Sequence, residues 1–416
     1  MKIFARNFRG FKNLRVDLEK NIFLIGDNSS GKSSIIYLIE AVTSGRLNMP
    51  PTLDEHFGVS RYDYFSPYFD MADVTFGFMI ENNSRPSNAK IITVKKSDEP
   101  LPKLMRCTYW IPGFSVRLRR SGSKARVSID EAPHSMDEAE LLRLHNSPGN
   151  FKRNDSIDVT EIADPQSLFY MDFEGETFSK LRSAMFGQSL RQCRVTSPVR
   201  ALPERFYENR RKFDAHGLHF ARVWLDIFEN NPEIFEYIDE FGRESGLFEK
   251  LHVDPVSKVI EDPPLFVSVV RNQRRFSLNQ VGVGVSQIVP VMMDSLFSLK
   301  FDGRQMLVQQ PELHLHPVAQ AALGTYFYHM CRLGLRCVFE THSSFFVDRF
   351  RSELRGQKQS SAPGSADDPF SEIIFCEAKN RGNVAHRVLI NNDGTLSGEP
   401  KSYHQFFLDE LLRTMF

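Results

Sequence analysis

Three short apolar runs, KIFARNF, LRVDL and NIFLI, open the chain. The apolar run NIFLI, residues 21–25, leads directly into the polar loop GDNSSGKSS, residues 26–34. The residues that follow, SIIYLIEAVTS, have the apolar spacing of a helix packed on a sheet. A strand, a glycine loop and a helix in this order predict an α/β nucleotide-binding fold.

The pattern changes twice further along the chain. Between about residues 70 and 130, short alternating segments such as DVTFGFMI and AKIITVKK predict antiparallel strands. From about 216 to 250 the apolar spacing is nearer to a helical period, and from 264 the α/β rhythm resumes with PLFVSVV. The elements of the α/β fold are therefore split between both ends of the chain, and the middle is predicted to be an insertion.

Composition narrows the class of protein. Of the 416 residues 41% are hydrophobic, and 52 lysines and arginines balance 52 aspartates and glutamates. A net charge of zero gives no overall attraction to nucleic acid or membrane. No apolar run approaches the ~18 residues of a transmembrane helix, and the five cysteines form no CxxC pair. We therefore expect a globular cytoplasmic protein with reduced thiols.

The strongest motif is a phosphate-binding loop. GDNSSGKS, residues 26–33, fits the pattern GxxxxGK[ST] and lies between a predicted strand and a predicted helix. The alternative is a glycine-rich turn that carries Lys-Ser by chance, and the strand and helix on either side favour the phosphate-binding motif. Lys32 is predicted to neutralise the β and γ phosphates of ATP, and the Ser33 hydroxyl to ligate Mg²⁺. The predicted nucleotide-binding residues are Gly26, Asn28, Ser29, Ser30, Gly31, Lys32, Ser33 and Ser34.

Several separate segments together resemble a known family. They are RNFRGFKN before the loop, SPVRALPERFY at 197–207, VGVGVSQIVPVM at 281–292, QQPELHLHP at 309–317 and ETHSSFF at 340–346. These segments resemble the ABC/SMC-like ATPases, often called AAA family ATPases. That group is related to the ATPase part of OLD-family nucleases and to RecF-like ATPases, and it occurs in bacterial anti-phage defence operons.

The resemblance implies an α/β fold, an ABC/SMC-like P-loop ATPase head with an antiparallel β subdomain and a helical insertion. The implied domains are an N-terminal ATPase lobe (1–110), an inserted β and helical region (111–275) and a C-terminal ATPase lobe (276–416). Too few residues follow 375 for a TOPRIM-like nuclease region, so we expect any effector nuclease or toxin to be separately encoded.

In this group ATP lies between two heads, which implies a homo-oligomer, a dimer or larger. Gly282, Gly284 and Ser286 resemble the signature motif that contacts the γ-phosphate of the partner head, although the same glycines also suit an ordinary turn. His342 stands where such ATPases place a switch histidine that senses the γ-phosphate. We interpret His314 and His316 as packing and intersubunit residues rather than as a metal pair.

The segment QQPELHLHP departs from the family pattern. Acidic residues normally stand where Gln309 and Gln310 stand here, one near magnesium and one near the attacking water. An amide cannot take a proton and adds no charge to a metal shell. Glu312 is the nearest carboxylate. Either Glu312 supports slow hydrolysis, or a partner supplies the carboxylate, or ATP is bound without turnover.

We favour slow hydrolysis, with Glu312, Gln310 and His342 as catalytic candidates and Ser33 and Gln309 as metal positions. The arginines of the 117–126 hairpin and those near 200–211 could contact DNA phosphates. One alternative function is therefore a RecF-like repair ATPase that acts on DNA. Another is a scaffold that binds ATP without turnover. An equal number of acids favours solvated faces and salt bridges for the hairpin, and Arg200 and Arg205 are interpreted as structural or nucleotide-proximal.

Overall fold

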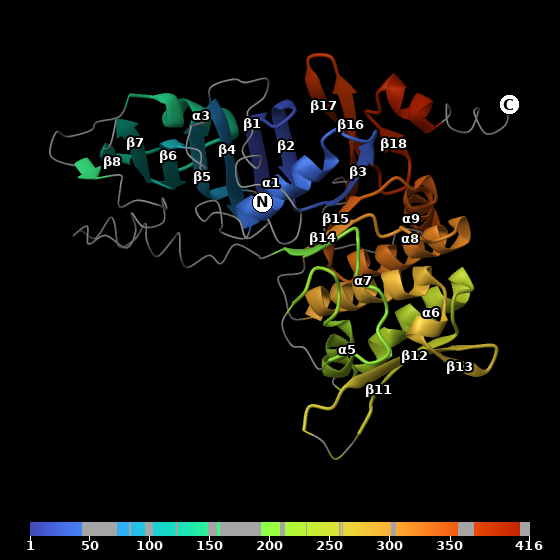
Figure 1. The fold of residues 1–416 in the computed structure, drawn as a ribbon. Helices are drawn as coiled ribbons and strands as arrows, with labels where there is room; N and C mark the ends of the chain where they lie inside the picture. Colours follow the sequence, from blue (N-terminus) through green and yellow to red (C-terminus); the bar gives the residue numbers. More distant parts are fainter. Residues whose placement is uncertain are drawn as a thin grey trace. The chain divides into compact units, whose positions relative to one another are not determined.

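A computed structural model describes most of the chain. The described residues are 1–43, 73–82, 85–95, 103–121, 124–148, 156–158, 193–208, 213–229, 231–257, 259, 261–300, 305–356 and 370–407. The contacts divide the chain into two compact units (Figure 1). The first comprises Met1–Glu19, Asp27–Leu190 and Glu377–Ala385, and the second comprises Lys20–Gly26, Arg191–Cys376 and His386–Phe416.

The first unit is built on an antiparallel sheet. Its strands follow the order β2-β1-β4-β5-β6-β7-β8-β9. One helix, α3 (Glu138–Asn146), begins with a capping box at Asp137 and packs on Trp110, Ile91 and Met79. The remaining elements are β1 (Lys2–Phe8), β2 (Phe11–Asp17), α1 (Lys32–Thr43), β4 (Asp73–Asn82), β5 (Arg85–Lys95), β6 (Lys103–Ile111), β7 (Phe114–Ser121), β8 (Lys124–Glu131) and β9 (Ser156–Asp158).

The second unit contains a mainly parallel sheet. Strands β10 (Arg194–Thr196), β14 (Gln305–Gln309), β15 (Arg336–Glu340), β3 (Asn21–Gly26) and β16 (Ser371–Lys379) lie side by side in this order. Every residue of β3 and β14 is buried, as expected for parallel strands covered on both faces. The carboxyl ends of β14, β15 and β3 therefore meet at one edge, where Gln309 pairs with Glu340 and Glu340 with Leu24.

Helices cover this sheet. They are α7 (Val283–Lys300), which packs on β14, α8 (Pro317–Arg332) and α9 (Ser344–Gly356), which packs on α8. Beyond them, α5 (Phe220–Phe228), η6 (Pro232–Phe235) and α6 (Glu236–Ser245) precede a small antiparallel sheet. That sheet consists of β11 (Lys250–Pro255), β12 (Leu265–Arg271) and β13 (Arg274–Ser277), in this order. A short 3-10 turn, η7 (Leu278–Gln280), leads into α7, and β17 (Gly382–Ile390) pairs with β18 (Leu396–Ser397) near the C-terminus.

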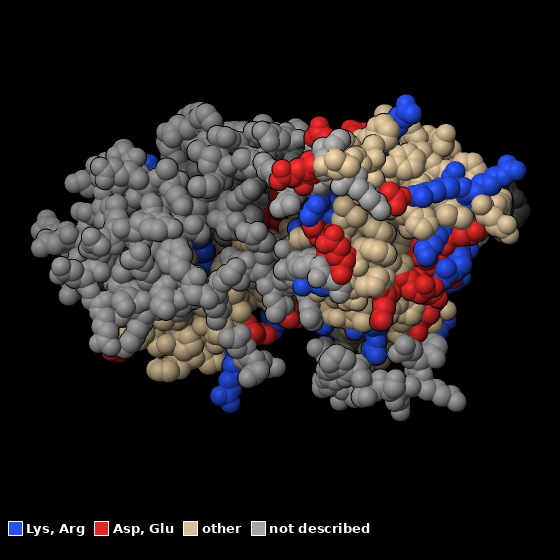
Figure 2. All heavy atoms as spheres, turned by 90° about the horizontal axis from the view of Figure 1, so that it is seen from below, with Lys and Arg blue, Asp and Glu red and all other residues tan. Residues whose placement is uncertain are grey.

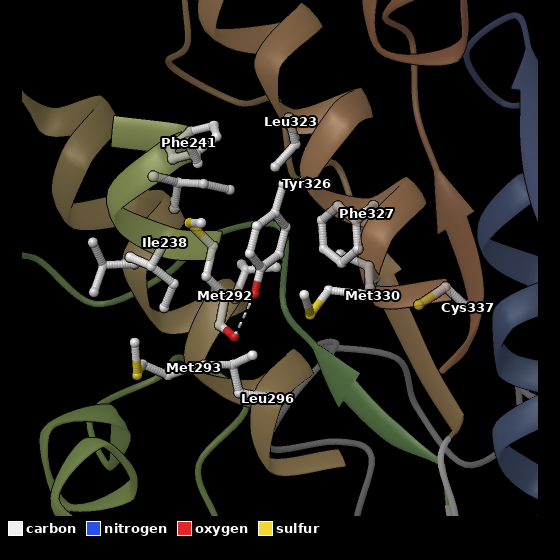
Figure 3. Close-up of a cluster of buried hydrophobic side chains, with 14 of the residues drawn as sticks. Ile238, Phe241, Met292, Met293, Leu296, Leu323, Tyr326, Phe327, Met330 and Cys337 are labelled. Carbon is white, nitrogen blue, oxygen red and sulfur yellow. Dashed lines mark hydrogen bonds between the residues drawn. The ribbon is translucent and has the colours of Figure 1, made fainter. Parts of the chain in front are cut away.

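The core of the second unit is apolar, and it encloses the hydrogen-bonded hydroxyl group of Tyr326. Figure 3 shows Tyr326 of α8 reaching α7 among Met292, Leu296 and Phe241. The Tyr326 hydroxyl lies 2.7 Å from the Ser295 Oγ and 3.2 Å from the Met292 carbonyl oxygen. Full burial of a phenol is tolerated here because its O–H group has these partners.

The α/β class, the antiparallel β subdomain and the helical segment that the sequence predicts are confirmed. The boundary expected after residue 110 falls inside the β6–β7 hairpin, where Ile111 pairs with Phe114. The three-part division of the chain stays a prediction. No helix among the described residues is both long and apolar enough to cross a membrane.

Candidate nucleotide-binding site

The phosphate-binding loop follows β3 in the chain and has the conformation of an anion cradle. Positive φ angles occur at Gly26 (145°), Ser29 (63°) and Gly31 (97°). Such a succession turns backbone N–H groups toward one point, where they bind phosphate oxygens. Helix α1 then begins at Lys32, so its positive N-terminal end adds to the same site.

Side chains of the loop leave polar groups available to a ligand. Lys32 is only 4% exposed, and its Nζ donates to the Asp27 carbonyl oxygen at 2.7 Å. This contact holds the ammonium over the loop itself. The Ser30 hydroxyl is buried and has no hydrogen-bond partner among the described residues, which is costly unless a ligand or water completes it.

Glycine is required at position 31 for two reasons. Its φ of +97° is unfavourable for other residues, and a Cβ there would lie 2.5 Å from Cε2 of Phe11 and 2.7 Å from Nδ2 of Asn383. Phe11 belongs to the segment RNFRGFKN, but neither Phe11 nor Asn383 was predicted to contact the loop. These contacts have no signal in the local sequence, because β2 and the start of β17 approach the loop only in the folded unit.

The two glutamines of the segment QQPELHLHP lie at the end of β14 in the second unit, Gln309 as its last residue and Gln310 directly after it. Gln309 is buried, and its Nε2 has no hydrogen-bond partner among the described residues. Gln310 adopts a positive φ of 42°, and its backbone N–H donates to the Glu340 carbonyl oxygen at 2.8 Å. The chain therefore turns away from the sheet immediately after Gln309.

Arg200 lies against the end of the same strand. It follows β10, which pairs with β14, and its Nη2 donates to the Gln309 carbonyl oxygen at 3.0 Å. Its side chain is buried, and neither Nε nor Nη1 has a hydrogen-bond partner among the described residues. Burial lowers the pKa of Arg200 to about 10, and the Glu312 and Asp294 carboxylates oppose that shift. The guanidinium is therefore charged at neutral pH.

Glu312 is a buried carboxyl group in the turn after β14. Its Oε1 accepts the backbone N–H of His342 at 2.8 Å, while its Oε2 is buried without a partner among the described residues. Burial raises the pKa of Glu312, and hydrogen bonds from His342 and Thr341 and the charge of Arg200 act against that rise. A carboxyl group with a raised pKa and one open oxygen suits proton transfer to or from water.

The residues at the end of β14 do not fit a magnesium ion. Mg²⁺ prefers carboxylate, phosphate and water oxygens in octahedral geometry. Here the strand ends in two amides, and a buried guanidinium is bonded to the last carbonyl oxygen. No group of three or more His, Cys, Asp or Glu residues able to hold a metal occurs among the described residues. The Ser33 hydroxyl, in the first unit, remains the candidate metal ligand.

His342 lies on a tightly fixed turn after β15. Ser343 Oγ donates to Gln320 Oε1 at 2.6 Å and accepts the Phe346 N–H at 3.1 Å, and the Ser343 N–H donates to Thr341 Oγ1 at 3.0 Å. His342 itself is exposed. His342 is therefore an exposed residue on a turn that is held by these hydrogen bonds.

The signature-like glycines mark the start of α7. Gly282 is exposed directly before the helix, and the Ser286 Oγ donates to the Val283 carbonyl oxygen at 2.8 Å. Gly284 packs against the turn after β14, since a Cβ there would lie 2.7 Å from the His314 carbonyl oxygen. A hollow of about 360 Å³ adjoins this turn and is lined by Leu247, Arg271, Val281, Gly282, Val283, Gly284, Val285, His314 and His316.

The structure therefore brings together two of the predicted groups within the second unit. The first group lies at one edge of the sheet and consists of Gln309, Gln310, Glu312 and the backbone of His342. The second group lines the hollow and consists of His314, His316, Gly282 and Gly284. Arg200 was expected to be structural or nucleotide-proximal, but its bond to Gln309 was not foreseen. The only sequence signal was its place in SPVR after a short strand.

A parallel sheet whose strand leads into a phosphate-binding loop defines a P-loop ATPase. Residues 1–181 match the family model described as AAA ATPase domain. The match of residues 1–181 to an AAA ATPase domain bears out the resemblance to AAA family ATPases. No curated protein matches the chain.

Solved structures of SMC heads are similar to the chain at low identity. The SMC head domain from Thermotoga maritima has a TM-score of 0.41 at 10% identity, covering 92% of this chain and 97% of that one. The SmcHead bound to the C-winged helix domain of ScpA has a TM-score of 0.44 at 11% identity, covering 94% and 98%. The Smc head domain with an extended coiled coil bound to the C-terminal domain of ScpA, derived from Pyrococcus furiosus, has a TM-score of 0.39 at 11% identity, covering 99% and 98%.

Proposed function

We propose that this protein is an ABC/SMC-like ATPase that assembles around ATP, hydrolyses it slowly and controls a separately encoded nuclease or toxin in anti-phage defence. The observation that carries the proposal is the loop from Gly26 to Ser33, with its three positive φ angles and buried Lys32. The effector and the defence setting rest on the family resemblance alone.

Assembly through ATP is supported by the hollow at the start of α7. Arg271 supplies a positive charge there, and the N-terminus of α7 adds the positive end of the helix dipole. Gly282 leaves the approach open, since a Cβ at this position would meet nothing within 4 Å. These features suit a phosphate of a nucleotide held by a second copy.

Slow turnover follows from the charge at the end of β14. Glu312 is the nearest carboxylate in sequence to the two glutamines, and its raised pKa suits a group that exchanges a proton with water. Gln310 and His342 are proposed to orient water and to sense the γ-phosphate. Phosphoryl transfer depends mainly on positioning and charge, so the loss of a carboxylate reduces the rate without abolishing it.

A direct action on DNA has less support from the basic hairpin. Arg117 bonds Asp130 and Ser147, and Arg119 bonds the Ser147 carbonyl oxygen. On the face shown in Figure 2, basic and acidic side chains of the described residues are interspersed. Arg210, Arg211 and Lys212 lie outside the described residues. A scaffold that binds ATP without turnover is favoured by the two glutamines and stays the main alternative.

The test combines mass measurement with a phosphate-release assay. We expect ATP to shift the purified chain to a dimer or larger assembly and phosphate to appear slowly, and Lys32→Ala to abolish both. Lys12→Ala, on an exposed position of β2, is the matched control and should leave both unchanged. Absence of ATP binding to the wild type would refute the proposal, and assembly without phosphate release would favour the scaffold.

A further inference from the structure

A side chain from near the C-terminus packs against the phosphate-binding loop within the first unit. Asn383 lies at the start of β17, and its backbone N–H donates to the Gly10 carbonyl oxygen at 2.7 Å. It is level with Phe11, where β17 runs parallel to β2. Gly10, Phe11, Gly31 and Asn383 all belong to the first unit, so their contacts are internal to one compact body.

The Asn383 amide occupies the space between two glycines. A Cβ at Gly10 would overlap the Asn383 Nδ2 atom and lie 2.8 Å from its Cγ. A Cβ at Gly31 would lie 2.7 Å from the same nitrogen. Because glycine has no Cβ, it permits such a close approach between backbone and side chain. The amide is therefore held on one side by the β1–β2 turn and on the other by the phosphate-binding loop.

The two glycines differ in what requires them. Gly31 has a φ of +97° and also meets Phe11, so glycine is needed there for its backbone conformation as well as for space. Gly10 has no positive φ, and the three atoms nearest to a Cβ at this position would all belong to Asn383. Gly10 is therefore the position at which the contact with the amide can be changed without backbone strain.

The place of Gly31 in the loop gives this contact a consequence for ligand binding. Gly31 leads directly into α1, whose first residue is Lys32. The backbone N–H groups of such a loop bind phosphate only while the loop keeps its conformation. A glycine has many alternative conformations, and a side chain packed behind it excludes some of them. A site ordered before its ligand arrives binds more tightly, because less conformational freedom is lost on binding.

We propose that Asn383 is a positioning residue of the nucleotide site, because its side chain, held between Gly10 and Gly31, keeps the phosphate-binding loop in the form that receives ATP. The inference rests on the proposed function, since it concerns the same site. Asn383 lies outside residues 1–181, which match the AAA ATPase domain. A strand from near the other end of the chain thus completes the N-terminal loop.

The first test removes the amide and measures the dissociation constant of ATP on the full chain. Asn383→Ala should weaken ATP binding by about tenfold. Val384→Ala, at the next and exposed residue of β17, is the matched control and should stay within about twofold of the wild type. Urea unfolding identifies any loss of binding that comes from loss of the fold.

This test separates two failures. A wild type that binds no ATP would refute the proposed function. A wild type that binds ATP, with Asn383→Ala binding it equally well, would overturn only the positioning role of Asn383.

Gly10→Ala tests the same contact from the opposite side and does not depend on the folding of Asn383→Ala. The added methyl group should displace the amide, so we expect a loss of ATP affinity similar to that of Asn383→Ala. The double variant should bind ATP no more weakly than the weaker single variant, because both changes remove one contact. Losses that multiply in the double variant would show that Gly10 and Asn383 act separately, against the proposal.

Inorganic tripolyphosphate distinguishes an effect on the loop from a contact with the nucleoside, because it carries phosphates without a base or sugar. The concentration that displaces a fluorescent ATP analogue should be about tenfold higher for Asn383→Ala than for the wild type. If Asn383→Ala weakens ATP binding but leaves tripolyphosphate binding unchanged, Asn383 contacts the nucleoside, and the positioning role is wrong.

Discussion

The Arg200 guanidinium donates a hydrogen bond to the backbone carbonyl oxygen of Gln309 at 3.0 Å. This bond connects the segment after β10 to the last residue of β14, next to the place where related ATPases carry acidic residues. The substitution of both acids by glutamine thus coincides with a buried positive charge beneath the same strand. The two features are consistent with each other, because a cation bound at the end of this strand would be repelled by the guanidinium.

The glycines at the start of α7 offer a matched pair of substitutions. Gly284→Ala places a Cβ 2.7 Å from the His314 carbonyl oxygen, whereas a Cβ at Gly282 meets nothing within 4 Å. We expect Gly284→Ala to lower the free energy of unfolding by about 1–3 kcal/mol and Gly282→Ala to change it by less than about 0.5 kcal/mol. Urea unfolding of both variants measures this difference.

The same pair tests the proposed signature role. Gly282→Ala should weaken ATP-driven assembly while the fold stays intact, because the added methyl group narrows the approach to the hollow. If Gly282→Ala assembles with ATP as the wild type does, the turn is an ordinary helix start. Equal stability of the two variants would show that the Gly284 contact with His314 is not close in solution.

Glu312 is expected to set the rate of phosphate release. Glu312→Gln retains an oxygen that accepts the His342 N–H, but it cannot take a proton. We therefore expect phosphate release to fall by about tenfold or more while ATP binding is retained. An unchanged rate would show that the carboxylate comes from elsewhere or that none is used.

The raised pKa of Glu312 also gives the direction of a pH effect on stability. The folded protein favours the protonated carboxyl group, so its contribution to stability is complete below the ordinary pKa of 4.5 and is lost as the pH rises through the raised pKa. The free energy of unfolding of the wild type should therefore decline relative to that of Glu312→Gln as the pH rises above 4.5. Urea unfolding of both proteins across this range gives the comparison.

His145 of α3 predicts an acid sensitivity in the first unit. Its Nε2 and Nδ1 lie 2.8 Å from the hydroxyls of Thr93 and Thr108, and burial lowers its pKa to about 3. The stability that the neutral ring contributes is complete above the ordinary pKa of 6.5 and is lost as the pH falls toward 3. The loss between pH 7 and pH 5 should be about 2 kcal/mol.

His145→Gln should remove this pH dependence, because glutamine does not titrate in this range. The variant should also lose one of the two hydrogen bonds to Thr93 and Thr108. His134→Gln, at an exposed position of the same unit, is the control and should unfold with the wild-type pH profile. Chemical unfolding followed between pH 7 and pH 5 distinguishes the two. An unaltered profile for His145→Gln would assign the acid sensitivity to other groups.

The sequence alone was sufficient for the phosphate-binding loop and the class of fold. The motif Gly26–Ser33 is local: its glycines, lysine and serine act through the backbone that they themselves shape, so spacing identifies them. The strands β14 and β15 were also readable, because a strand covered on both faces has few polar residues. The run PLFVSVV, with which the α/β rhythm was predicted to resume, instead forms β12 of the small antiparallel sheet. The antiparallel strands between 73 and 131 showed the alternation of a sheet with two different faces.

Tertiary structure decided what surrounds these motifs. The contact of Arg200 with Gln309 joins residues that are 109 positions apart, and the packing of Asn383 beneath Gly31 joins the two ends of the chain. Hydrophobic periodicity reports which face of an element is buried, but not which distant polar group will meet it. The absence of acids at 309 and 310 was visible in the sequence, whereas the buried cation beside them emerged only when the parallel strands were paired.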